Sequence, residues 1–351
     1  MNYTFEDVLI LPQWSEIESR SQVDTTTEFL DEFYKIPIMS ANMDTITESR
    51  MATKLYELGA VGVLHRFQTI EQNVEMFKKS PMGTFCSFGI GEHERKRFEA
   101  LWNAGCSNFI LDVAHGATKV TADQYIAIRE RFNDARIVVG NFATRQSIGD
   151  FMYYCTKRDV KYPAAWKVGI GGGAMCTTRV VTGVGLPQLS ALQECSMLGV
   201  PLIADGGIKN SGDYAKALAI PNVKMVMLGS LLSGTDETPG ELCANNGQSL
   251  LSLALEFPEL EFQKFKKYRG SASKESYEVQ GKIADHRTAE GESTLVEYKG
   301  PVENVIQQLQ AGLKSSMSYV GASNLTEFQE RAKMVVISNN SNNEGKAHGK
   351  T

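Results

Sequence analysis

The chain has 351 residues, a formal net charge of −5, 42% hydrophobic residues and 22% charged residues. These proportions are ordinary for a soluble globular protein with one sizeable core. The acidic balance argues against a nucleic-acid or anionic-membrane partner, and no apolar run approaches the roughly 20 residues that span a bilayer.

At the N-terminus, Glu6 and Asp7 stand where a signal peptide needs basic and then apolar residues, so we expect a cytoplasmic protein. The six cysteines form no Cys-x-x-Cys pair, and the five histidines are scattered. This pattern argues against a zinc site and against a disulfide framework. Most of the cysteines are therefore expected to be small buried hydrophobic residues.

Short apolar segments alternate along the chain with amphipathic helical segments. Near-continuous apolar strands joined by helical crossovers indicate a parallel sheet that is covered on both faces. The predicted strands are 36–43, 60–66, 84–90, 108–114, 136–142, 165–170, 201–205 and 224–229. Helical segments between them include 51–59, 69–80, 93–105, 121–133 and 211–220.

This alternation predicts an α/β fold, a (β/α)8 TIM barrel whose catalytic domain spans 1–337. A doubly wound Rossmann sheet is the alternative. However, the glycine cluster 169–173 follows the sixth strand, whereas a dinucleotide fingerprint follows the first strand of its unit. The polar segment 231–300 is long enough to form an active-site lid after strand 8. The tail 338–351 is too polar to pack, so we expect it to be disordered.

In a barrel, the residues that follow the strands converge on one mouth. The loops "DGG" at 205–207 and "LGS" at 228–230 suit a phosphate, because glycines let the backbone approach an anion and Ser230 adds a hydroxyl. The same glycines would also serve plain tight turns. Asp205 would repel a phosphate, and it better suits the hydroxyls of a ribose.

The sixth strand leads into "GIGGGAMCTTR" at 169–179, and Cys176 is the one cysteine that sits in a glycine-rich turn. Such a turn can expose the sulfur as a nucleophile toward an electron-poor carbon, although a buried structural thiol is equally compatible with the residues. Thr178 is a turn former, or else a catalytic threonine that needs a partner base. Glu290 in "RTAEG" is a candidate for that base, but a lone glutamate in a polar loop is usually solvated.

Up to about residue 330, the chain resembles the IMP dehydrogenase/GMP reductase family. The stretches that carry the resemblance are "FEDVLILP", "SRSQVD", "SANMDT", "DVAHG", "VGNFAT", "KVGIGGGAMCTTRVVTGVGLPQLSA", "IADGGIKNSGD", "VMLGSLLSGTDETPGE" and "YKGPVENVI". The resemblance implies a (β/α)8 barrel, usually tetrameric, that acts on a purine nucleotide with a nicotinamide cofactor.

The two branches of this family run opposite chemistry. The dehydrogenase oxidises IMP to XMP with NAD, and the reductase converts GMP to IMP and ammonia with NADPH. Three features resemble the reductase: no regulatory insertion interrupts the barrel, no "RYF" flap lies between Gly270 and Gly300, and "HRTAEG" is present. We therefore expect a homotetrameric GMP reductase that uses NADPH. The alternatives are an IMP dehydrogenase without its regulatory domain and a catalytically silent purine-nucleotide-binding protein.

By resemblance, Cys176 attacks purine C2, and Thr178 and Glu290 form a proton relay that protonates the departing amine. The residues expected at the nucleotide are Met43, Asp205, Gly206, Gly207, Gly229, Ser230, Ser271, Arg287 and Gly291. Those expected at the cofactor are Arg66, Ser87, Gly89, Asp112 and Asn141. The family also implies a K⁺ ion held by carbonyls near Gly171 and Gly173. Ala174 departs from the family pattern, because a serine commonly stands there and would add a hydroxyl to the phosphate.

Overall fold

The eight predicted strands lie in one parallel sheet that closes into a barrel, so the predicted fold is confirmed. In this computed structural model the described residues are 2–257, 259–260, 262–279, 288–338, 341 and 345. A parallel bridge between Met39 and Val61 joins the first strand to the second and closes the ring. The barrel strands are β4 (Ile38–Ser40), β5 (Val63–Leu64), β6 (Phe85–Phe88), β7 (Asn108–Asp112), β8 (Arg136–Phe142), β9 (Ala165–Val168), β10 (Leu202–Asp205) and β11 (Val223–Leu228).

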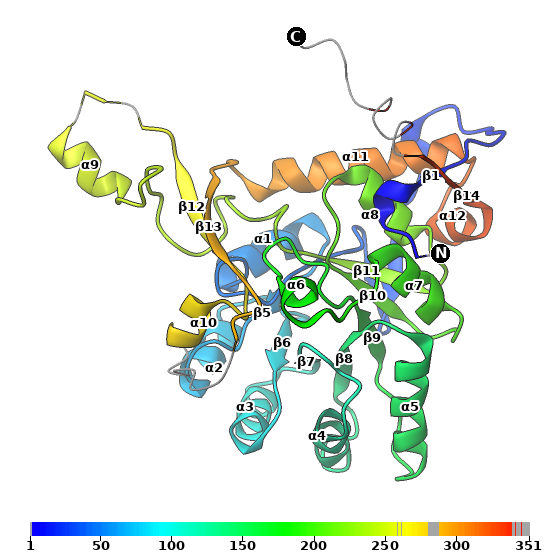
Figure 1. Cartoon of the computed structure of the whole chain (residues 1–351), viewed down its shortest axis with the longest axis horizontal. Coiled ribbons are helices and arrows are strands. Elements are labelled where there is room, and N and C mark those ends of the chain that lie inside the picture. The colour runs from blue at the N-terminus through cyan, green and yellow to red at the C-terminus, as the bar shows by residue number, and fades with distance from the viewer. Residues whose placement is uncertain are drawn as a thin grey trace.

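Helices surround the barrel, as Figure 1 shows, and several of them begin at a threonine or asparagine whose side chain caps the first turn. The last long helix packs between the helix that precedes β11 and the first one of the ring. The surrounding helices are α1 (Ser49–Leu58), α2 (Ile70–Lys78), α3 (Glu92–Asn103), α4 (Lys119–Arg129), α5 (Arg145–Thr156), α7 (Gln188–Ser196), α8 (Ser211–Leu218) and α11 (Val302–Tyr319).

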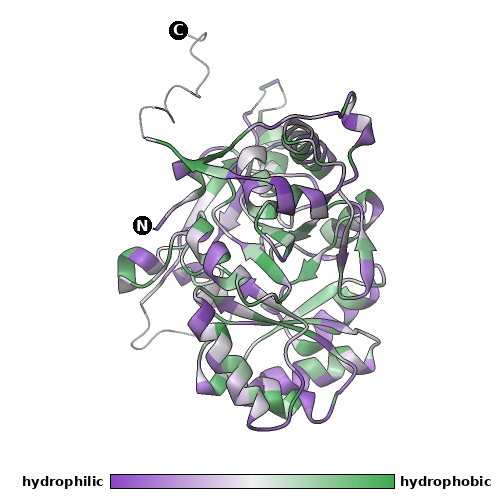
Figure 2. Ribbon diagram, turned by 90° about the vertical axis from the view of Figure 1, so that its right-hand side faces the viewer, coloured by the Kyte–Doolittle hydropathy of each residue, from purple (hydrophilic) through white to green (hydrophobic). Residues whose placement is uncertain are grey.

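The barrel has two hydrophobic cores because alternate side chains of each strand point inward and outward. The inner core contains Phe85, Ile110, Val138 and Ile203, while the outer core lies between strands and helices. Phe29 joins the inner core from the hairpin of β2 (Thr27–Phe29) and β3 (Glu32–Tyr34), and its ring stacks on Phe85 with centroids 6.2 Å apart. Hydrophobic strands at the centre and hydrophilic stretches on the outer helices are visible in Figure 2.

Both ends of the described chain meet beside the barrel. An antiparallel pair joins β1 (Val8–Ile10) to β14 (Met334–Val336), next to α12 (Leu325–Arg331). In the part of the chain that the structure describes, no helix is long and apolar enough to cross a membrane. Only 338, 341 and 345 of the tail are described, so the expected disorder of 338–351 falls mostly outside the described residues.

The segment after β11 folds into elements of its own. It contains α9 (Leu250–Glu256), α10 (Lys274–Val279) and an antiparallel pair of β12 (Phe265–Arg269) with β13 (Ser293–Glu297). Figure 1 shows α9 and the far end of this pair reaching out from the barrel, while α10 lies close to the barrel mouth. A short helix, α6 (Thr178–Thr182), completes the structure beside that mouth.

Candidate active site

A cavity of about 390 Å³ opens where the barrel strands end, and the segment after β11 forms part of its wall. Parallel strands bring their C-terminal ends to one edge, which is why residues far apart in sequence meet here. Residues from the barrel that line it include Asn42, Met43, Arg66, Asp112, Asn141, Lys167, Asp205 and Gly206. Residues from the segment after β11 are Tyr268, Gly270, Ser271, Ala272, Tyr277, Glu290 and Gly291.

The cysteine loop after β9 presents Cys176 to this cavity. The Cys176 N–H donates to the Gly173 carbonyl at 3.0 Å, so backbone turns place the sulfur. Arg179 holds the base of the loop, because its guanidinium donates to the Ile170 carbonyl at 3.1 Å and to the Leu186 carbonyl at 2.5 Å. Cys176 is only half-buried, whereas Cys86, Cys106, Cys155 and Cys195 are buried.

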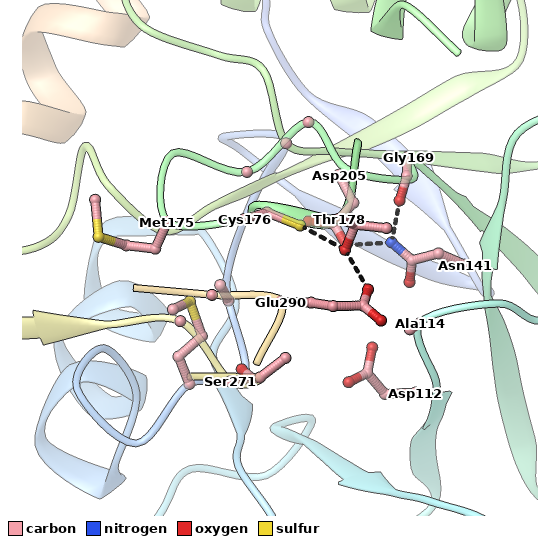
Figure 3. Close-up of a pocket in the computed structure, with 18 of the residues that line it drawn as sticks. Asp112, Ala114, Asn141, Gly169, Met175, Cys176, Thr178, Asp205, Ser271 and Glu290 are labelled. Carbon is pink, nitrogen blue, oxygen red and sulfur yellow. Dashed lines mark hydrogen bonds between the residues drawn. The ribbon is translucent and has the colours of Figure 1, made fainter. Parts of the chain in front are cut away.

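A chain of hydrogen bonds leads from the cysteine to a carboxylate. The Cys176 thiol donates to the Thr178 hydroxyl at 3.1 Å, and that hydroxyl donates to Glu290 Oε2 at 2.7 Å. Figure 3 shows Thr178 between the sulfur and the carboxylate. A threonine hydroxyl both accepts and donates, so it can pass a proton in either direction between its two neighbours.

Backbone hydrogen bonds dock residues 290–292 against the cysteine loop. The Thr177 N–H donates to the Glu290 carbonyl at 2.9 Å, and the Glu292 N–H donates to the Met175 carbonyl at 3.0 Å. Gly291 lies between them, and a Cβ there would come within 3.2 Å of the Met175 carbonyl oxygen. A side chain at this position would crowd these atoms, so the glycine in "EGE" favours the close approach that brings Glu290 to Thr178.

An ion pair also joins the segment after β11 to the loop that follows the first barrel strand. Arg269, the last residue of β12, forms an ion pair with Asp44 in the loop after β4, and its Nε lies 3.2 Å from both carboxylate oxygens. Arg269 also lies 3.3 Å from Glu275 of α10. The Asp44 and Arg269 side chains are 8% and 13% exposed, which reduces screening of the pair by solvent.

The opposite wall of the cavity carries a network of amides and carboxylates. The Asn141 amide donates to Asp205 at 2.8 Å and to the Gly169 carbonyl at 2.6 Å (Figure 3). Asn42 donates to Asp112 at 3.0 Å. Burial alone would raise the pKa of Asp112, but Lys167 beside it brings that pKa below its usual value. Asp112 is therefore a carboxylate at neutral pH.

Most of the predicted site residues line the cavity. Those that line it are Cys176, Thr178, Glu290, Met43, Asp205, Gly206, Ser271, Gly291, Arg66, Asp112, Asn141, Gly171 and Gly173. Arg287 lies outside the described residues. Gly207, Gly229 and Ser230 are not part of the lining, although Gly229 lies beside it: a Cβ there would come within 3.3 Å of the Tyr268 hydroxyl.

The geometry argues against two of the expected cofactor contacts. Ser87 is 1% exposed, and its hydroxyl donates to the Leu64 carbonyl at 2.8 Å inside the barrel wall. The Gly89 N–H donates to the Glu94 carboxylate at 2.7 Å. Neither residue is part of the cavity lining, and Ser87 is buried within the barrel wall.

Sequence reasoning missed Lys167 and Tyr268, both of which line the cavity. A lysine within the apolar run "AWKV" was a usable signal, since a charged residue inside a buried strand needs partners. Burial raises the pKa of Tyr268 to about 12, so its hydroxyl stays a neutral donor at physiological pH. Nothing in the sequence around Tyr268 separates it from an ordinary structural residue.

No group of three or more histidine, cysteine or acidic side chains that could hold a metal occurs among the described residues. The K⁺ ion expected at Gly171 and Gly173 would use backbone carbonyls instead. The Gly173 carbonyl already accepts the Cys176 N–H, and a carbonyl oxygen has a second lone pair for an ion. Hard oxygen ligands of this kind fit an alkali cation, although the loop alone offers few of them.

The sequence matches the family model described as "IMP dehydrogenase / GMP reductase domain" over residues 2–348. It is 33% identical to the GMP reductase of Vibrio cholerae, over 97% of this chain and 96% of that protein. A crystal structure of inosine 5′-monophosphate dehydrogenase from Legionella pneumophila is 38% identical, with a TM-score of 0.82 over 97% of this chain and 99% of that chain.

A crystal structure of a GMP reductase variant from Trypanosoma brucei in complex with guanosine 5′-monophosphate has the same fold. Its TM-score is 0.86 at 24% identity, over 100% of this chain and 98% of that chain. Relatives of both names thus match along nearly the whole chain. The chain belongs to the IMP dehydrogenase/GMP reductase family of oxidoreductases.

Proposed function

We propose that this protein is a GMP reductase, which converts GMP to IMP and ammonia with NADPH. The observation that carries the proposal is the continuous chain of hydrogen bonds from Cys176 through Thr178 to Glu290. Reductive deamination needs a nucleophile at purine C2 and an acid for the departing amine. The three hydrogen-bonded side chains, which line one cavity, supply both the nucleophile and the acid.

The direction of the hydrogen bonds suits the first step. When the Cys176 sulfur adds to C2, its proton passes to Thr178, and Thr178 passes its own proton to Glu290. Glu290 then returns a proton to Thr178, and the Thr178 hydroxyl donates its own proton to the nitrogen on C2. An amine leaves as ammonia far more readily once it is protonated. NADPH bound beside Asp112 and Asn141 would supply a hydride to C2, and Cys176 would then leave the carbon as a thiolate.

The other residues that line the cavity divide the remaining roles between the nucleotide and the cofactor. We assign Asp205 to the ribose, together with glycines of the loops after β10 and β11 for the phosphate. Met43, Ser271 and Gly291 would face the base. Asp112, Asn141 and Arg66 would contact the cofactor. The Arg66 guanidinium lies 5.3 Å from the centroid of the Phe67 ring.

The remaining expectations follow from the family. We propose a cytoplasmic homotetramer, which light scattering after gel filtration would test. We also propose a K⁺ ion at Gly171 and Gly173. Replacement of K⁺ by Li⁺ at constant ionic strength should lower the rate if the ion organises the cysteine loop, and an unchanged rate would remove the ion from the proposal.

The IMP dehydrogenase reaction is the second candidate, favoured by the 38% identity to the Legionella enzyme. Two mixtures separate the candidates: the protein with GMP and NADPH, and the protein with IMP and NAD. We expect the 340 nm absorbance of the reduced nicotinamide to fall in the first mixture and to stay constant in the second. Turnover in the second mixture only would overturn the proposal, and nucleotide binding without turnover in either would indicate a silent binder.

A further inference from the structure

Lys167 is the most enclosed charged group of the cavity wall, and the proposed chemistry assigns it no role. It lies in β9, and its side chain is 3% exposed. An ammonium has three N–H donors, and all three are used. Its Nζ lies 2.8 Å from Asp112 Oδ1, 2.6 Å from Asp205 Oδ2 and 2.5 Å from Asn141 Oδ1. Lys167 thus contacts two residues assigned to the cofactor, Asp112 and Asn141, and one assigned to the ribose, Asp205.

The other charged groups around this cluster are few. Arg66 faces Asp112 from the loop after β5 and lies 4.0 Å from Glu94 of α3. The Tyr268 hydroxyl lies on the Asp205 side, from β12. Glu290 lines the same cavity from the segment after β11. Among the residues that the structure describes, Lys167 is the one cation within hydrogen-bond distance of both aspartates.

We propose that Lys167 is a positioning residue that holds Asp112 and Asp205 as a fixed pair of carboxylates and thereby couples the nucleotide side of the site to the cofactor side. The kinetic consequence of this role rests on the proposed function. Its electrostatic consequence does not, because it concerns the ligand-free protein alone.

Removal of the lysine changes how stability depends on pH. Burial alone would lower the pKa of Lys167, but the two aspartates raise it above its ordinary value, so the cation persists at neutral pH. Without it, burial and the neighbouring Asp205 carboxyl would raise the pKa of Asp112. A group with a raised pKa in the folded state loses its stabilising contribution as pH rises through that value. The variant should therefore lose stability between about pH 5 and pH 8.

In the wild type the sign is opposite. The lowered pKa of Asp112 contributes stability that is fully present above the ordinary pKa of aspartate and is lost only as pH falls below it. The ionisation of Asp112 should therefore not lower the urea midpoint of the wild type between pH 5 and pH 8. The gap between the midpoints of the wild type and Lys167→Met should widen as pH rises.

Lys266 offers a matched control because it is another buried lysine of the same chain. It is 5% exposed, and its ammonium binds the carbonyls of Asp236 at 3.2 Å and Thr238 at 2.8 Å, outside the cavity. Lys266→Met should lower the urea midpoint by an amount that does not change between pH 5 and pH 8. Equal, parallel pH profiles for the two methionine variants would overturn the proposal.

Two further variants guard against the possibility that Lys167→Met fails to fold. Lys167→Arg keeps the charge, so its gap to the wild type should not widen with pH. The double variant Lys167→Met with Asp112→Asn removes one carboxylate together with the cation, and its profile should also be flat. A widening gap in either of these variants would show that charge balance is not the cause.

Kinetic measurements distinguish a positioning role of Lys167 from a role in folding alone. With GMP and NADPH, Lys167→Met should lower kcat/KM for both substrates by at least about 10²-fold, and Lys167→Arg should recover at least about tenfold of that loss. Loss for one substrate only would overturn the coupling. If the wild type shows no turnover, the proposed function fails, whereas the pH profiles of the urea midpoint still decide the role of Lys167.

Discussion

The two walls of the cavity are built by different means. Asp112, Asn141, Lys167 and Asp205 come from neighbouring strands of the barrel, where the sheet and both cores hold the backbone. The wall that carries Glu290 comes from the segment after β11. It is docked by a few backbone hydrogen bonds to residues 175–177 and by the ion pair of Arg269 with Asp44.

This difference separates binding from chemistry. The barrel wall forms with the fold, so the groups proposed to bind the ribose and the cofactor are present whenever the barrel is folded. The relay from Cys176 to Glu290 is complete only when both walls meet, because it joins residues 112 positions apart. A local loss of docking should therefore remove catalysis while leaving the barrel folded.

Cys176→Ala should have the largest effect of any single change. Without the sulfur no bond to purine C2 forms, so turnover with GMP and NADPH should be abolished while nucleotide binding persists. Stopped assays with a sensitive ammonia readout, together with calorimetric titration of GMP, would measure both. Cys243→Ala is the matched control, since Cys243 is also half-buried but does not line the cavity. Turnover by Cys176→Ala would exclude covalent catalysis.

Glu290→Gln should have the second-largest effect on activity, because it changes the carboxylate that accepts the hydrogen bond from Thr178. The amide keeps the shape of the side chain but cannot hold and return a proton, so kcat should fall by roughly 10²–10⁴-fold. Glu292→Gln is the control, because its side chain is exposed and only its backbone contacts the cysteine loop. Activity of Glu290→Gln close to that of the control would remove Glu290 from the relay.

Arg269→Met tests the docking of the second wall directly. Loss of one partner of a largely buried ion pair leaves Asp44 uncompensated, so the wall should separate more often from the barrel. We expect kcat/KM to fall roughly 10- to 100-fold and limited proteolysis of the segment after β11 to speed up, with little change in the urea midpoint.

Lys267→Met provides the comparison for Arg269→Met. Lys267 pairs with Glu275, but its side chain is 52% exposed, and such surface pairs contribute little. Its kcat/KM should stay within about twofold of the wild type. Equal losses for the two variants would mean that the ion pair with Asp44 is not what docks the wall.

The barrel wall was predictable from local signals, whereas the docked wall was not. Each barrel strand is a short apolar run in the sequence. Within the predicted 60–66, β5 covers only Val63–Leu64, and Val61 pairs with Met39 as an isolated bridge. Glu290 was a candidate base from its sequence context, but its pairing with Thr178 was expected from the resemblance. No periodicity of the sequence tells that residues 290–292 pair with the cysteine loop, since these contacts are long-range.

Within the barrel itself, Lys167 shows what pattern reading overlooks. The run "AWKV" was interpreted as an apolar strand, and the fold prediction was correct for that reason. The lysine is tolerated there because three other strands deliver its acceptors, and their register relative to β9 is a property of the closed sheet. The partners of a buried charge therefore emerge only with the tertiary structure.

The smallest expected effect concerns a site far from both walls. Asn324 caps α12, its side chain accepting the Glu327 N–H at 3.0 Å, and Gln329 of the same helix donates to the Leu218 and Val223 carbonyls. Asn324→Ala should lower the free energy of unfolding by about 1 kcal/mol, and Asn324→Asp should lower it far less. Because α12 contributes nothing to the cavity, kcat should not change.

Arg269→Met and Asn324→Ala are then opposite cases. The first should lose activity at constant global stability, and the second should lose stability at constant activity. A fall in kcat for Asn324→Ala would mean that the outer helices control the site, contrary to the separation of the two walls.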